Sequence, residues 1–134
     1  VTRFKGDVRA AVLTPHILAM FVGMLLSTRA GLAAVFGGRL RLVTYLTLAL
    51  LVAGGLVLGP IVQKAAFGAY WTGVPWGWDL TDNKTLIAAL AWTFAAWRVG
   101  RGGLGARSAV GLAAVVTLAV FAIPHSVWGS EVKW

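Results

Sequence analysis

Long apolar runs alternate with short polar stretches along the whole chain. The runs are continuous in Ala, Leu and Val and lack the period-two alternation that strands of a membrane β-barrel show over about ten residues. A helix needs about 20 apolar residues to cross a bilayer. We therefore predict an all-α polytopic membrane protein, a four-transmembrane-helix bundle. It forms a single membrane domain over residues 1–134, with helices at about 15–36, 42–62, 81–98 and 108–124.

Local signals suggest where these helices begin and bend. Thr14 can cap free N–H groups, and Pro15 suits the first helical position because its missing N–H costs nothing there. Pro60 is expected to kink the second helix near its end. Thr81 or Asp82 can cap the third helix, which is short and spans a membrane only if it begins by about residue 81 or is covered by protein.

The segments outside the helices are short. Residues 1–13 mix charged and apolar side chains and are predicted to form an interfacial arm. Residues 63–80 are predicted to form an outer loop rich in tryptophan, whose amphipathic ring favours the membrane–water boundary. Within the second helix, Gly55 and Gly59 form a small-xxx-small pair, by chance or as a site of close helix approach.

Composition supports the membrane assignment. The 134 residues are 59% hydrophobic, with a mean hydropathy of +0.82. The net charge of +8 comes from basic residues that stand singly or in pairs beside apolar runs, so we expect the lipid bilayer as a partner and no nucleic acid. Cysteine is absent, which excludes disulfides, thiolate metal sites and covalent haem attachment.

The basic residues also predict an orientation. Each of two predicted turns carries arginine and no acid: Arg29, Arg39 and Arg41 in the first, and Arg98, Arg101 and Arg107 in the second. By the positive-inside rule both turns are cytoplasmic. The N-terminus, the tryptophan-rich loop and the C-terminus then lie outside, in a bacterial-type inner (cytoplasmic) membrane.

Both histidines of the chain fall at the outer face in this topology. His16 begins the first helix and His125 follows the fourth. Two neutral imidazoles can supply both axial ligands of a b-type haem. The alternatives are that the histidines contact a quinone or another ligand, or that each is an interfacial residue bonded to a headgroup or a helix end.

The sequence Gly73-Val-Pro-Trp76-Gly-Trp78-Asp79 resembles the signature of the tryptophan-rich (WWD-type) haem-handling membrane proteins of cytochrome c biogenesis. The resemblance implies an outer loop that receives the flat face of haem between histidines from neighbouring membrane helices. It covers residues 73–79 only. Trp71 stands two residues before Gly73 rather than beside it, and those proteins have more membrane helices than the four predicted here.

The residue types around the loop permit a haem site. Trp71, Trp76 and Trp78 can form the walls of an apolar slot, and the cations Lys64, Lys84 and Arg9 can pair with propionates. Asp79 can fix the tautomer of a ligating imidazole. Asp82 is expected to cap a helix and to pair with Lys84 or solvent. A mixed metal site of His16, His125, Asp79 and Glu131 is a further alternative.

Two functions remain open from the sequence. The leading hypothesis is a membrane protein that binds haem b at its outer face, for electron transfer or haem handling. The alternative is a non-catalytic accessory subunit of a larger respiratory or photosynthetic complex, whose loop contacts a partner subunit, lipid or quinone. No hydrolytic or nucleotide-binding motif occurs, so as an enzyme the chain is at most a redox component, working with other membrane subunits or a redox partner.

Overall fold

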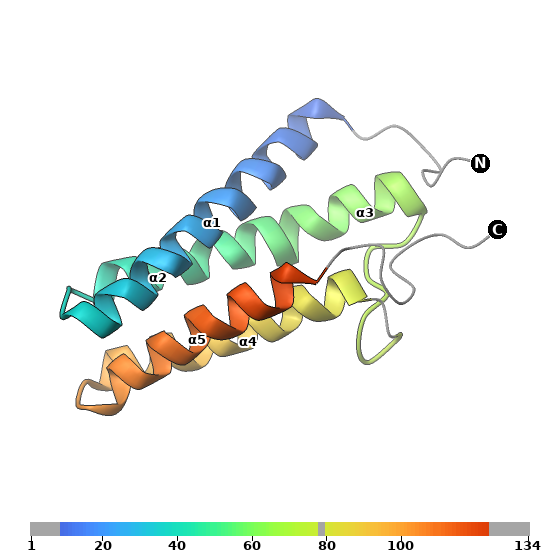
Figure 1. Ribbon diagram of the computed structural model, residues 1–134. Helices are drawn as coiled ribbons and strands as arrows, with labels where there is room; N and C mark the ends of the chain where they lie inside the picture. The colour runs from blue at the N-terminus through green and yellow to red at the C-terminus, as the bar shows by residue number, and fades with distance from the viewer. Residues whose placement is uncertain (1–8, 78–79, 124–134) are drawn as a thin grey trace.

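The computed structural model describes residues 9–77 and 80–123, and within them every regular element is helical (Figure 1). The elements α2, η1 and α3 follow one another without a break, so the described chain forms four helical rods, in agreement with the predicted number. The bounds are α1 Ala10–Phe36, α2 Arg41–Leu51, the π-helix η1 Val52–Leu58, α3 Gly59–Phe67, α4 Leu80–Arg101 and α5 Gly105–Ala122.

The four rods form a closed ring. Helix α1 packs against α2 and α5, and α4 packs against the same two neighbours. The turns at 37–40 and 102–104 lie together at one end of the bundle, which we call the arginine end (Figure 1). The loop at 68–77, the start of α1 and the end of α5 lie at the other, which we call the tryptophan end. Three rods are long and apolar enough to cross a membrane: Ala10–Phe36, Arg41–Ala66 and Gly105–Ala122.

Helix α4 is the most polar of the four rods. It begins at Leu80, before residue 81, which was the latest start that would let it span a membrane. Its middle is covered by protein. Trp92 has an exposed fraction of 0%, and its indole N–H donates to Thr117 Oγ1 of α5 at 2.8 Å. Small side chains dominate the core around it, which lets the rods approach closely. The core alanines are Ala30, Ala88, Ala95, Ala109, Ala113 and Ala114.

The predicted start of the first helix differs from the observed one. Helix α1 begins at Ala10, so Pro15 lies inside it and Thr14 is not its cap. The proline ring removes the donor that would reach the carbonyl of Ala11 and crowds that carbonyl. Both residues are exposed, so solvent can bind the freed oxygen. Residues 10–13 of the predicted interfacial arm are therefore helical, and residues 1–8 lie outside the described part of the chain.

The second rod is longer than predicted and changes its winding before Pro60. Helix α3 continues to Phe67, where Gly68 ends it with a φ of 87° and donates its N–H to the Lys64 carbonyl at 3.0 Å. In a regular α-helix Pro60 would collide with the carbonyl four residues earlier, and the wider π-turns of η1 relieve that collision. Where the sequence predicts a kink at Pro60, the structure has a π-helix immediately before it. The last rod also begins earlier than predicted, at Gly105.

Candidate functional site at the tryptophan end

His16 of α1 faces the π-helix. Its Nδ1 lies 2.7 Å from the carbonyl oxygen of Gly54, which also accepts the N–H of Gly59. A carbonyl can only accept, so Nδ1 carries the proton in this contact. In the neutral ring the other nitrogen, Nε2, then keeps a free lone pair.

Two glycines allow η1 to pack this closely. A Cβ atom at Gly54 would lie 2.9 Å from the Cβ of Ala19 on α1, and one at Gly55 would overlap the methyl group of Thr85 on α4. A Cβ at Gly59 would only be in ordinary contact with the His16 ring, at 3.6 Å. Of the small-xxx-small pair, Gly55 is therefore at a close helix approach and Gly59 is not. Together with Gly54, Gly55 lets the π-helix lie between α1 and α4.

Asp82 ties the loop to the first turn of α4. Its carboxylate accepts the backbone N–H of Thr72 at 2.7 Å and the Thr72 hydroxyl at 3.1 Å, and its exposed fraction is 6%. Gln63 of α3 donates to the same hydroxyl at 3.0 Å, and Asn83 accepts the N–H of Val74 at 2.8 Å. Because α4 begins at Leu80, Thr81 and Asp82 lie inside its first turn, and neither is the predicted N-cap. Asp82 anchors the loop instead.

Lys84 is buried rather than available at the surface. Its exposed fraction is 1%, and its ammonium group donates to the carbonyl of Ile123 at 2.7 Å and lies 5.9 Å from the centre of the Phe121 ring. Both contacts are at the end of α5. The predicted partner of a propionate therefore holds the point where the chain leaves α5, immediately before Pro124 and His125.

Lys64 remains on the surface. Its ammonium group donates to the Gly68 carbonyl at 3.0 Å and lies 5.4 Å from the centre of the Tyr70 ring. Arg9, the other predicted cation, is exposed at the N-cap of α1 and makes no side-chain cap bond. Both cations lie at the tryptophan end, where an anionic group could reach them.

The predicted aromatic walls are described in part. Trp71 is half-buried and donates its indole N–H to the carbonyl of Val74 at 3.1 Å. Trp76 follows a turn closed by its own N–H to the Gly73 carbonyl at 3.0 Å, and it has an exposed fraction of 81%. The other predicted site residues, Trp78, Asp79 and His125, lie outside the described residues, as does Glu131.

Sequence reasoning missed the residues that hold the loop. Thr72, Gln63 and Asn83 carry no motif, and their partners become evident only when α3, the loop and α4 are placed together. Gly54 was missed as the histidine partner because its carbonyl is backbone. Among the described residues no group of three or more His, Cys, Asp or Glu side chains could hold a metal ion.

Comparison of the chain with protein-family models, with curated proteins and with solved structures found no match. The candidate site therefore stands on the geometry of the tryptophan end.

Proposed function

We propose that this chain is a membrane protein that binds one b-type haem at its tryptophan end, with His16 as an axial ligand, for electron transfer or haem handling. The observation that carries the proposal is the contact between His16 Nδ1 and the Gly54 carbonyl. Histidines that ligate a metal almost always donate their other ring N–H to a carbonyl or carboxylate, which fixes the tautomer and the ring plane. His16 already makes this bond through Nδ1, which leaves Nε2 for a metal.

The surrounding residues fit a haem in three further respects. Lys84 fixes the backbone at Ile123, where α5 ends at the tryptophan end, and His125 follows Ile123 by two residues in the sequence. Trp76 offers an exposed ring for stacking, and Lys64 offers an exposed cation for a propionate. The haem would supply one-electron chemistry.

The direct test is a titration of the purified protein with haemin, followed by visible absorption. We expect a saturable Soret shift at one haem per chain. His16→Ala should lower the affinity at least about tenfold, as loss of an interaction at a metal site does. Arg101→Gln, at the opposite end of the bundle, is the matched control and should leave the titration unchanged. A wild-type protein that shows no saturable shift would exclude the haem site.

Membrane insertion and orientation are part of the same proposal. Three rods of sufficient length and hydropathy support insertion, and the arginines of the two turns support a cytoplasmic arginine end. Because the chain lacks cysteine, single cysteines can report sidedness. In intact cells, an impermeant thiol reagent should label Trp76→Cys and spare Gly103→Cys. The reverse labelling would invert the topology.

A further inference from the structure

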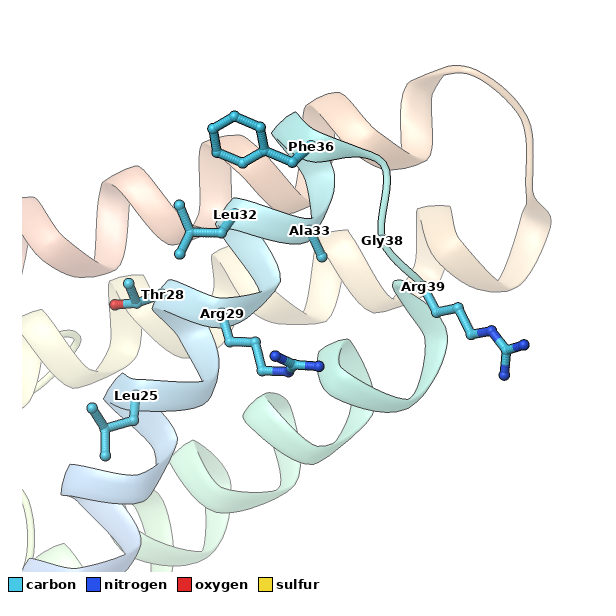
Figure 2. A pocket seen from close by; sticks show the side chains of 8 residues that line it. All are labelled: Leu25, Thr28, Arg29, Leu32, Ala33, Phe36, Gly38 and Arg39. Carbon is cyan, nitrogen blue, oxygen red and sulfur yellow. The ribbon is translucent and has the colours of Figure 1, made fainter.

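A groove of about 680 Å³ lies along α1 at the arginine end, far from the proposed haem site (Figure 2). One part of its lining is apolar. Leu25, Leu32 and Phe36 have exposed fractions of 69%, 54% and 80%, so the described bundle leaves more than half of each uncovered. The groove is completed by Arg29 of α1 and by Arg39 of the turn that follows it.

The two arginines have no partner of opposite charge in the described structure. Neither guanidinium makes a hydrogen bond or an ion pair there, and Asp82, the acidic residue among those described, lies at the other end of the bundle. Figure 2 shows the Arg29 side chain extending from α1 toward α2 and that of Arg39 extending away from the turn. The groove thus joins an unpaired positive charge to an uncovered apolar surface.

The end of α1 would ordinarily oppose an anion here, because the last carbonyls of a helix carry partial negative charge. Arg107 of α5 removes this obstacle. Its guanidinium donates to the carbonyls of Ala33 at 2.8 Å and Gly38 at 3.1 Å, and both of these residues line the groove. The positive charge of Arg107 therefore adds to that of Arg29 and Arg39.

We propose that this groove binds one anionic phospholipid, with its phosphate at Arg29 and Arg39 and its acyl chains along Leu25, Leu32 and Phe36. Basic pockets at the membrane boundary of helical bundles attract acidic headgroups. A free phosphate would use the arginines and leave the apolar wall exposed, whereas a phospholipid matches both parts. The position is also suitable: Arg29 lies about 10 Å along the helix axis from the end of α1, which is within headgroup reach for a long side chain.

The test is native mass spectrometry of the full chain in detergent, with equimolar phosphatidylglycerol and phosphatidylcholine carrying identical acyl chains. We expect the wild type to retain phosphatidylglycerol preferentially. Arg29→Gln and Arg39→Gln should each reduce that preference about fivefold, since a basic residue near anionic lipid contributes about that factor. Arg101→Gln, an arginine of the same end outside the groove lining, should retain it.

A second variant tests the space in the groove separately from its positive charge. Thr28 lines the groove and is exposed, so Thr28→Trp should fill the space while keeping both arginines, and it should lower phosphatidylglycerol retention. Equal retention of the two lipids by the wild type, or an equal loss in Arg101→Gln, would overturn the proposal. Displacement of the lipid by glycerol 3-phosphate alone would show a phosphate site rather than a lipid site, and would overturn it too. The haemin titration is independent of every outcome.

Discussion

The two ends of the bundle are held together in different ways. At the tryptophan end, buried charged side chains bind backbone groups: Asp82 accepts the N–H of Thr72, and Lys84 donates to the carbonyl of Ile123. At the arginine end, short glycine turns close the hairpins and the arginines are largely exposed, with Arg107 bonded across the helices. A buried, bonded charge holds a position closely, whereas an exposed one mainly provides electrostatic potential. The tryptophan end is therefore suited to a fixed cofactor, and the arginine end to the charged boundary of a membrane.

The largest expected effect is at the π-helix. Gly55→Ala would place a methyl group against Thr85, whose branched side chain has little freedom to move, so we expect a loss of about 3 kcal/mol in the free energy of unfolding. Gly111→Ala is the matched control, because a Cβ there meets nothing within 4 Å, and it should be neutral or stabilising. Unfolding in mixed micelles measures both. Equal stabilities would show that the close approach is not needed.

A smaller loss is expected from the loop anchor. Asp82→Ala removes a charged acceptor with two bonds to Thr72, so we expect about 2 kcal/mol of destabilisation. Hydrogen exchange should show the Thr72 amide losing its protection. Asn83→Ala, which frees only the N–H of Val74, should have a weaker effect confined to the turn. If the Thr72 amide stayed protected in Asp82→Ala, the loop would be held by other contacts.

At the arginine end, substitution of Arg107 should lower the free energy of unfolding by less than Asp82→Ala does. Arg107→Gln breaks the exposed bonds to the carbonyls of Ala33 and Gly38, and we expect about 1 kcal/mol of destabilisation because solvent can replace them. Thermal unfolding compared with Arg101→Gln, whose guanidinium only lies 5.4 Å from the Trp97 ring, isolates the contribution of the bonds. A loss as large as that of Asp82→Ala would show that the charged side chains at the two ends stabilise the fold equally.

The smallest stability effect is expected at the exposed tryptophan. Trp76→Ala should change the free energy of unfolding by less than about 0.5 kcal/mol, since its ring is 81% exposed. The same variant should weaken haemin binding if the ring stacks on the porphyrin. Unchanged haemin affinity would remove Trp76 from the proposed site and leave the histidine assignment standing.

The sequence predicts the helical architecture well because hydrophobic runs and glycine-rich turns are local signals. The number of rods follows from them, and so does the need for α4 to begin near residue 81. The winding of η1 does not, since it depends on how Pro60 is accommodated within a packed helix. Thr14 and Pro15 suggested a helix start because the sequence does not show that an exposed turn can tolerate the proline.

The candidate site is predictable from the sequence only in part. His16 could be selected because histidine is rare in apolar helices. Its partner could not, because the Gly54 carbonyl is a backbone group brought near by packing between α1 and η1. Lys84 was chosen for its charge, but its burial and its bond to Ile123 depend on the end of α5, far away in the sequence.

The most direct measurement of the central claim is imidazole rescue of His16→Gly. We predict that the haem-loaded wild type shows the low-spin absorption spectrum of a haem with two axial histidines, that the variant loses this spectrum, and that added imidazole restores it by occupying the vacated position. Circular dichroism of the variant should match that of the wild type. A variant that keeps the wild-type spectrum without imidazole, or that imidazole leaves unrestored despite an intact fold, would contradict His16 as the ligand.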